Sequence, residues 1–432
     1  MNKLKKLILT VMINQVIGLC RWMMNVTNRK VVGRMKEQIA KLMYVWIVNC
    51  FSLLSKRLPV KKRLVYLMSF PKNENGFLKN FMEQSPNIEV VLLYDENCKE
   101  EAKAFEKMGA KTYLLTSTIP FLKRAVNELM QAKVIVCDNY FPLLAGFYPK
   151  KKTTIIQLWH ANGAIKRFGL EDPTAMKRSF LDRKRFKQVY KRFDEYIVGS
   201  EYMGKVFQKS YGATEKQIIP IGYPRSDVYF NEEDIESKRT HFYEIYPHLK
   251  NKKIILYAPT YRENSNAGYP LDIPLMFKEL GNSYAVLMKK HPKSLEHIVV
   301  DGYKDFFYAD LDDFKTEELM TVAECLITDY SSVPFDFTLL ENAKKIIFYW
   351  YDQEDYEKQT GIQNGFIEYV PGEIVHTMEE VVSVIKSEND NEKMFNKFNQ
   401  KWNTYNDGWA KYRLVNYIQK KISGSEARGV LK

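Results

Sequence analysis

Residues 325–351 read CLITDYSSVPFDFTLLENAKKIIFYWY, and this stretch decides the fold of the chain. The apolar run 325–328 has β-branched members and predicts a buried strand, and the apolar run at the end of the stretch (IIFYWY) predicts a second one. Pro334 is typical of a first helical turn, where the N–H that proline lacks would have no partner anyway. Lys344 and Lys345 are expected to close that helix at its negative end. Strand, turn, helix and strand in this order predict a parallel βαβ unit.

The polar turn between this strand and helix is a candidate anion site. Ser331 and Ser332 lie where free backbone N–H groups and the positive end of a helix dipole meet, which favours phosphate. The alternative is an ordinary N-cap, in which one serine hydroxyl only pairs with the first helical turn. The sequence leaves both interpretations open.

Short apolar runs separated by helical stretches occur on both sides of this unit, and they predict an α/β protein with two parallel-sheet domains. We expect a basic amphipathic helical arm at 1–63, a first Rossmann-like domain at 64–235 and a second at 236–394. Residues 395–432 are expected to form a helix packing across both domains, followed by a tail. The predicted strands are 64–70, 88–94, 134–138, 154–159, 196–199, 218–221, 253–258, 284–289, 325–328 and 346–351.

The net charge of +13 is confined to the arm. Residues 1–63 contain 14 Lys and Arg against one Glu, and the rest of the chain has 51 basic and 51 acidic residues. The arm holds two apolar segments, 7–20 and 42–54, which are shorter than the roughly 20 residues of a spanning helix. Basic residues beside short apolar runs favour helices that lie on an anionic membrane surface. Core helices docked on the main body are the alternative.

The five cysteines are scattered and form no CxxC pair, so neither a zinc site nor a disulfide framework is indicated. A reducing cytoplasm is the simplest interpretation, which places the protein at the cytoplasmic face of the membrane as a peripheral protein. No carboxylate cluster has the spacing of a divalent-metal site, and we expect neither a metal nor a cofactor.

Four further clusters follow predicted strands, the position at which open α/β sheets bind their ligands. Together with the serine turn, they are expected to converge on one cleft between the two domains. The clusters are QLWHANGA at 157–164, GYPRSD at 222–227, YAPTYR at 257–262 and KKHP at 289–292.

These clusters resemble the CDP-glycerol glycerophosphotransferases of wall teichoic acid synthesis in Gram-positive bacteria. The resemblance covers roughly residues 130–370, and the wording WHANGAIKRFG is most similar to the enzymes that add the first glycerol phosphate. At 161–163 the chain reads Ala-Asn-Gly where a Gly-Thr-Pro turn is commoner in polymerases. The matching motifs are Trp159-His160-Ala161, Gly222–Arg225, Pro259–Arg262, His291-Pro292, Thr328–Phe337 and Phe348–Asp352.

The resemblance implies a GT-B-like fold and transfer of glycerol phosphate from CDP-glycerol to an undecaprenyl-diphosphate-linked saccharide, with release of CMP. A hydroxyl nucleophile needs a base with a near-neutral pKa, and histidine is the natural choice. His160 is the expected base, although a structural strand-end histidine is the alternative. His291 is expected to contact the donor phosphates, or else to begin a helix before Pro292.

The remaining site residues fall into a donor group and an acceptor group. A guanidinium fork suits phosphate oxygens, although a surface salt bridge is the alternative for Arg225. Asp329 would orient a hydroxyl, or merely finish its strand. The expected donor-binding residues are Arg225, Arg262, Lys290, Thr328, Asp329, Ser331 and Ser332, and those on the acceptor side are Asn162, Gly163 and Lys166.

A second basic run at 177–192 follows the histidine turn and is interleaved with apolar residues. It is expected to face anionic lipid or the pyrophosphate of the acceptor, or else to be a solvated helix face.

Other functions are compatible with the same sequence. A teichoic or capsule polyol-phosphate polymerase and a ribitol-phosphate transferase share the same motifs. A non-catalytic nucleic-acid-binding protein is the least favoured, because the excess charge is confined to the apolar arm and no nucleic-acid module is recognised.

Overall fold

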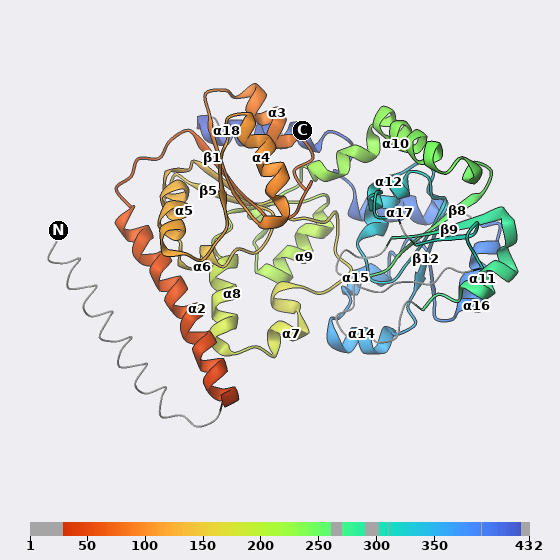
Figure 1. The fold of residues 1–432 in the computed structure, drawn as a ribbon. Coiled ribbons are helices and arrows are strands. Elements are labelled where there is room, and N and C mark those ends of the chain that lie inside the picture. The colour runs from red at the N-terminus through yellow and green to blue at the C-terminus, as the bar shows by residue number, and fades with distance from the viewer. Residues whose placement is uncertain (1–28, 261–269, 290–301, 310, 390, 425–432) are drawn as a thin grey trace.

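The computed structural model describes residues 29–424 except 261–269, 290–301, 310 and 390. Two lobes lie side by side, each built on one parallel sheet flanked by helices (Figure 1). The predicted apolar segment 7–20 lies outside the described residues. No helix in the described part of the chain has the length and apolar character needed to cross a membrane.

The sheet of the N-terminal lobe has the strand order β3-β2-β1-β4-β5-β6-β7, and every neighbouring pair is parallel. This order reverses between β1 and β4, as in a Rossmann fold, so the carboxyl ends of these strands form a ligand-binding edge. The strands are β1 (Arg63–Met68), β2 (Glu89–Tyr94), β3 (Lys111–Leu114), β4 (Val134–Cys137), β5 (Thr154–Gln157), β6 (Glu195–Ile197) and β7 (Ile218–Ile219).

The sheet of the C-terminal lobe has the equivalent order β10-β9-β8-β11-β12-β13, again with parallel pairs throughout. Its order reverses between β8 and β11, which confirms the prediction of two Rossmann-like units. The strands are β8 (Lys253–Ala258), β9 (Tyr284–Met288), β10 (Phe307–Tyr308), β11 (Cys325–Thr328), β12 (Lys345–Tyr349) and β13 (Glu373–Val375).

The sequence prediction missed three of these strands, β3, β10 and β13. All three lie at sheet edges or are only two or three residues long, and none carries a continuous buried apolar run. Edge strands are half solvated, so their residues give a weak apolar signal.

The helices of the N-terminal lobe cover both faces of its sheet (Figure 1). Helix α2 packs on α5 and α6, and Gly146 permits the close approach because a Cβ there would collide with the backbone of Val45. The helices are α2 (Arg29–Leu54), α3 (Phe77–Gln84), α4 (Lys99–Lys107), α5 (Ile119–Gln131), α6 (Leu143–Gly146), α7 (Pro173–Met176), α8 (Phe180–Tyr190) and α9 (Glu201–Tyr211).

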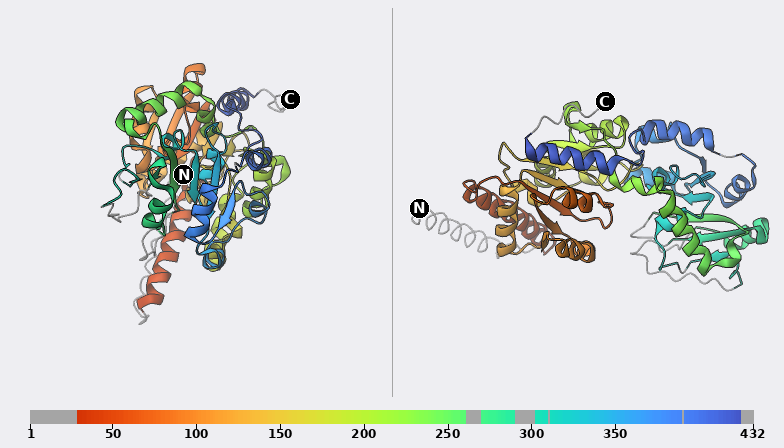
Figure 2. Two further views of the ribbon diagram at one scale, coloured as in Figure 1. Left: turned by 90° about the vertical axis from the view of Figure 1, so that its right-hand side faces the viewer. Right: turned by 90° about the horizontal axis from the view of Figure 1, so that it is seen from above.

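The last two helices connect the lobes. Helix α17 lies in the C-terminal lobe, and α18 runs back over the N-terminal lobe, where it contacts α3 (Figures 1 and 2). The helices from residue 232 onward are α10 (Glu232–Ile245), α11 (Ile273–Leu280), α12 (Thr316–Met320), α13 (Val333–Phe337), α14 (Gln353–Gln359), α15 (Asn364–Ile367), α16 (Met378–Lys386), α17 (Glu392–Trp402) and α18 (Ala410–Ser423).

Helix α13 is shorter than the sequence predicts. It ends at Phe337, and Lys345 begins β12 instead of closing the helix. The Lys345 ammonium donates to the carbonyl oxygens of Val384 (2.7 Å) and Ser387 (2.6 Å) at the end of α16. The lysine therefore does neutralise a helix C-terminus, but that of a helix far away in sequence.

Candidate active site

His160 lies two residues beyond the end of β5, at the carboxyl edge of the N-terminal sheet. Its ring stacks on Phe70, with centroids 3.8 Å apart and 9° between the planes, and its Nδ1 is 2.8 Å from the carbonyl oxygen of Asp138. A carbonyl oxygen can only accept, so Nδ1 carries the proton and Nε2 carries the lone pair. No side chain or backbone group among the described residues bonds Nε2, which is therefore ready to accept a proton.

The pKa of His160 supports the neutral form. Burial lowers this pKa from 6.5 to about 4, and the nearby Arg225 guanidinium acts in the same direction, against the hydrogen bond to Asp138. The imidazole is therefore neutral at physiological pH, the state that a general base requires.

The backbone before His160 is strained. Trp159 has a φ of +66°, a left-handed conformation that costs a bulky residue on the order of 1–3 kcal/mol. Its N–H donates to the side chain of Gln157 (2.9 Å), and its carbonyl accepts from Asn73 (2.7 Å). These two bonds hold the turn that presents His160.

Asp138, directly after β4, supports the same ring from behind. Its buried carboxylate accepts from the backbone N–H groups of Ser69 (2.8 Å) and Phe70 (3.0 Å) and from the Ser69 hydroxyl (2.9 Å). Burial raises its pKa to about 6 despite these bonds. Asp138 thus fixes Phe70 with its side chain and His160 with its carbonyl oxygen.

Arg225 joins the histidine turn to the C-terminal lobe. One guanidinium nitrogen donates to the carbonyl oxygen of His160, and another lies 3.2 Å from the carboxylate of Asp336 in α13. The other oxygen of Asp336 accepts from the side chain of Asn162. Burial raises the pKa of Asp336, and the Arg225 charge opposes this. The alternative of a surface salt bridge for Arg225 is excluded, because Asp336 is buried at the contact between the lobes.

The predicted acceptor residues occupy the same contact. Asn162 is buried, and Gly163 packs directly under the ring of Phe335 in α13, where a Cβ would collide with that ring. The structure therefore places both residues inside the contact between the lobes and not on an open acceptor surface. Lys166 is half-buried, lies 6.0 Å from the ring centroid of Tyr356, and forms a backbone bridge with Ile362.

The serine turn is located at the start of α13, as predicted. Ser332 is exposed, and the hydroxyl of Ser331 accepts from the N–H of Val333 at 3.3 Å. Asp329 is buried and accepts from the N–H (2.7 Å) and hydroxyl (2.6 Å) of Thr260, just after β8. These bonds join the end of β11 to the residue that follows β8, so Asp329 has the structural role that the sequence left as the alternative.

Thr328 corrects another prediction. This side chain is fully buried, and its hydroxyl donates to the carbonyl oxygen of Ala258 at 2.7 Å. It joins β11 to β8 and presents no group to a ligand. Arg262, Lys290 and His291 lie outside the described residues.

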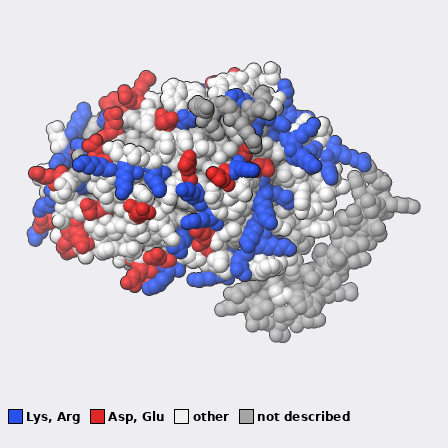
Figure 3. Space-filling model, turned by 180° about the vertical axis from the view of Figure 1, so that it is seen from behind, with Lys and Arg blue, Asp and Glu red and all other residues white. Residues whose placement is uncertain are grey.

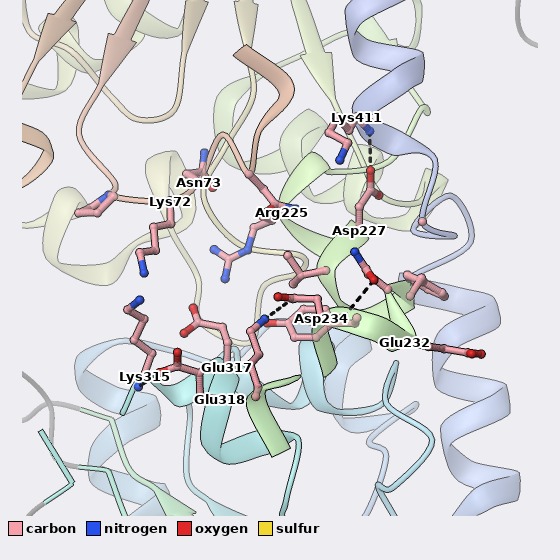
Figure 4. Close-up of a pocket in the computed structure, with 18 of the residues that line it drawn as sticks. Lys72, Asn73, Arg225, Asp227, Glu232, Asp234, Lys315, Glu317, Glu318 and Lys411 are labelled. Carbon is pink, nitrogen blue, oxygen red and sulfur yellow. Dashed lines mark hydrogen bonds and ion pairs between the residues drawn. The ribbon is translucent and has the colours of Figure 1, made fainter. Parts of the chain in front are cut away.

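A cleft of about 740 Å³ separates the lobes and has Arg225 in its wall (Figure 4). Lys72 reaches in from the loop after β1 and Lys315 from the start of α12, so that the two ammonium groups face each other. Burial and the charge of Lys315 lower the pKa of Lys72. Glu317 and Glu318 line the C-terminal side. Two facing cations would favour an anion between them.

Sequence reasoning missed Phe70, Asp138, Asp336 and the facing lysines. Phe70 and Asp138 each end a predicted strand, so the rule that selected His160 could also have selected them. Asp336 and the lysines gave no such signal, because their partners lie on the other lobe.

The chain resembles known proteins over most of its length. A family model described as CDP-Glycerol:Poly(glycerophosphate) glycerophosphotransferase matches residues 50–420. The teichoic acid glycerol-phosphate primase of Bacillus subtilis (strain 168) is 33% identical over 383 residues, which are 88% of this chain and 97% of that protein. The teichoic acid ribitol-phosphate primase of Bacillus spizizenii (strain ATCC 23059 / NRRL B-14472 / W23) is 31% identical over 399 residues, with coverage of 89% and 98%.

A solved structure has a similar fold. The wall teichoic acid polymerase TagF matches with a TM-score of 0.68 and 24% identity, over 90% of this chain and 98% of that one. This match confirms the predicted GT-B-like arrangement of two Rossmann-like lobes.

Proposed function

The chain belongs to the CDP-glycerol:poly(glycerophosphate) glycerophosphotransferase family, and we propose that it transfers glycerol phosphate from CDP-glycerol to a hydroxyl group of a membrane lipid-linked saccharide. The transfer primes a teichoic acid chain and releases CMP. The observation that carries the proposal is the presentation of His160, whose Nδ1 is engaged by a carbonyl oxygen while Nε2 is left without a described partner.

In this reaction the acceptor oxygen attacks the β-phosphorus of CDP-glycerol. A new P–O bond forms, the bond from that phosphorus to the bridging oxygen breaks, and its electron pair leaves with CMP. The hydroxyl proton passes to Nε2 of His160, which is neutral because its pKa is about 4 in the ligand-free protein. An anionic diphosphate beside the ring would raise this pKa towards the operating pH, which is where a base is most effective.

We assign the donor phosphates to the C-terminal lobe. The turn of half-buried Ser331 and exposed Ser332 offers hydroxyl and N–H donors at a strand end. Arg262, Lys290 and His291 are assigned to the same phosphates from their motifs. Their positive charge, with that of Arg225, would stabilise the leaving group without a metal ion. We therefore expect transfer to persist after exhaustive chelation, and activity restored only by Mg²⁺ would contradict this assignment.

The base is tested by His160→Ala, with product mass as the readout. The unaltered chain, CDP-glycerol and an undecaprenyl-diphosphate disaccharide analogue should give the acceptor plus one glycerol phosphate. His160→Ala should abolish this product while CDP-glycerol still binds. His248→Ala is the matched control, because this exposed histidine of the C-terminal lobe bonds the Tyr308 hydroxyl (2.8 Å) and lines neither the cleft nor the histidine turn. Unchanged turnover in His160→Ala would refute the assignment.

The second candidate is a ribitol-phosphate transferase or a polymerase of the same chemistry. The similarity to a ribitol-phosphate primase favours testing it. CDP-ribitol in place of CDP-glycerol separates the donors, and a ladder of products differing by one unit would identify a polymerase.

We propose that the protein acts at the cytoplasmic face of the membrane as a peripheral protein. The excess of positive over negative charge, which lies entirely in residues 1–63, supports this proposal. Exposed apolar side chains on neighbouring helices also support it, among them Trp46 of α2 and Phe180 of α8, which are 39% and 71% exposed.

A further inference from the structure

A second cavity, of about 1040 Å³, lies in the N-terminal lobe between α2, α8 and the carboxyl ends of the strands. Most of its surface is apolar, and three cations and two carboxylates also contribute to its wall. We call it the α2–α8 groove. Its apolar lining includes Met43, Tyr44, Val45, Ile47, Phe121, Leu122, Tyr140, Phe141, Leu143 and Phe186, and its charged residues are Lys41, Arg178, Arg185, Asp95 and Asp182.

Arg185 is the most informative residue of this groove. Its side chain is about nine-tenths buried, and one guanidinium nitrogen pairs with Asp182 and with Gln38 of α2 (3.0 Å). The other terminal nitrogen, Nη1, is buried and bonds no atom of the described residues. An unpaired buried donor is costly in a folded protein, so it indicates a missing acceptor.

Asp182, one of the two carboxylates of the groove, is held by several partners of its own. Asp182 accepts from Gln38 (2.7 Å) and Ser179 (2.8 Å) and pairs with Lys41 (3.4 Å) as well as Arg185. Burial acts to raise the pKa of Asp182, but the bonds from Ser179 and Gln38 and the charges of Arg185 and Lys41 outweigh it and lower the pKa to about 2. Arg178 lies over the ring of Phe186, with its guanidinium carbon 5.8 Å from the centroid, and Lys41 is a third exposed. Lys41 also pairs with Glu37 of the same helix, and both cations line the groove.

The groove reaches the strand ends that lie next to the candidate active site. Ser69 and Asn139 line it, and they are the immediate neighbours of the two residues that hold the His160 ring, Phe70 and Asp138. A molecule lying in the groove would therefore extend along the strand ends towards the catalytic histidine.

The face around the groove has the chemistry of a membrane contact. Leu42, Met43 and Trp46 of α2 and Phe180 and Leu181 of α8 are all more than one third exposed. Lysine and arginine side chains gather on the N-terminal lobe, whereas acidic side chains are more frequent on the C-terminal lobe (Figure 3). An amphipathic lipid anchored in the bilayer would thus meet the groove at its open side.

We propose that the α2–α8 groove binds the lipid-diphosphate portion of the acceptor, with the isoprenoid chain against its apolar lining and the diphosphate at Arg178, Arg185 and Lys41. This inference rests on the proposed function and gives the basic run 177–192, which the sequence indicates for anionic lipid or the acceptor's pyrophosphate, a defined groove and a partner element in α2. A bulk phospholipid headgroup shares the phosphate chemistry, but it needs no enclosed cavity and no buried arginine. The groove therefore suits one extended molecule that carries both an apolar chain and a phosphate group.

The test measures transfer by the unaltered chain and its variants with two acceptors. One is the disaccharide on a short isoprenyl diphosphate, and the other is the same disaccharide on an alkyl chain without phosphate. Arg178→Gln and Arg185→Gln should each raise KM for the diphosphate acceptor about tenfold or more. KM for CDP-glycerol and for the phosphate-free acceptor should stay within about twofold. Ser117→Trp, an exposed substitution in the groove wall, should raise KM for both acceptors, because each carries an apolar chain, and leave KM for CDP-glycerol within about twofold.

Arg124→Gln is the matched control, because Arg124 is an exposed arginine of the same lobe that lies over the ring of Tyr113 at 5.2 Å. Unchanged KM for the diphosphate acceptor in Arg178→Gln and Ser117→Trp would overturn the inference, while normal transfer would leave the proposed function intact. Absence of transfer to either acceptor by the unaltered chain would instead refute the proposed function. The arginine variants are also tested for binding to phosphatidylglycerol vesicles. A loss of vesicle binding as large as the loss of affinity for the diphosphate acceptor would assign the groove to bulk lipid and overturn the inference.

Discussion

Gly163→Ala should destabilise the contact between the lobes. A Cβ at this position would lie 2.6 Å or less from three carbons of the Phe335 ring, whereas a normal carbon contact is about 3.5–4.0 Å. The ring has little room to withdraw, because its centroid lies 5.0 Å from that of Phe398, 5.1 Å from that of Trp402 and 5.8 Å from that of Phe366.

Forcing one methyl group into such packing costs about 1–3 kcal/mol. We expect a loss near the upper end of this range and a fall in Tm of about 5–10 °C, at roughly 2–4 °C per kcal/mol. Urea and thermal unfolding of the purified variant measure the change. Transfer should also weaken, because Asn162 next to it holds Asp336, which in turn holds Arg225.

A double-mutant cycle with Phe335→Leu makes this reasoning refutable. If the two side chains collide, the smaller residue should relieve part of the cost of Gly163→Ala, giving a coupling of at least about 1 kcal/mol. Gly33→Ala is the control, because a Cβ there meets nothing within 4 Å and should stabilise α2 by about 0.5–1 kcal/mol. Additive effects, or a Gly163→Ala variant as stable as the parent, would show that the lobes do not pack in this way.

Three other outcomes follow from the same structure. The pKa of His160 is depressed from 6.5 to about 4, so its contribution to stability is present above pH 6.5 and is lost as pH falls towards 4. His160→Gln should therefore remove ~2 kcal/mol of the loss in unfolding free energy between pH 7 and pH 4.5, measured by urea unfolding against the parent chain. Phe70→Leu should lower kcat about tenfold without changing KM for CDP-glycerol, because the Phe70 ring stacks on His160 and positions it. An unchanged kcat in steady-state assays would contradict that role. Phe180→Ser combined with Leu181→Ser should reduce binding to anionic vesicles at least about tenfold in sedimentation, since burying each large apolar side chain is worth about 1.5–3 kcal/mol. Full retention of binding would place the membrane contact elsewhere.

The α/β class and most of the strands could be predicted because each buried parallel strand is a continuous run of apolar residues in the sequence. Residues 253–258 and 325–328 agree with β8 and β11 residue for residue. His160 could be selected for a related reason, since the carboxyl end of a parallel strand is a ligand-binding edge in any open α/β sheet. These inferences use only neighbours in the sequence.

The roles of Asn162, Gly163, Thr328 and Arg225 needed the tertiary structure. Each occurs in a motif beside the candidate site, where a ligand contact and a packing contact have the same appearance in the sequence. The difference depends on α13, more than one hundred residues away from Arg225 along the chain, whose Asp336 pairs with the guanidinium.

The sequence by itself determined the two parallel sheets, the charge asymmetry of the chain and the identity of the candidate base. Only the tertiary structure shows which polar side chains are buried and hydrogen-bonded at the contact between the lobes. Only the tertiary structure places Arg185 of α8 beside α2. The physical reason is that apolar periodicity is a local property of the chain. Burial and hydrogen-bond pairing of a polar group depend instead on whatever distant segment folds against it.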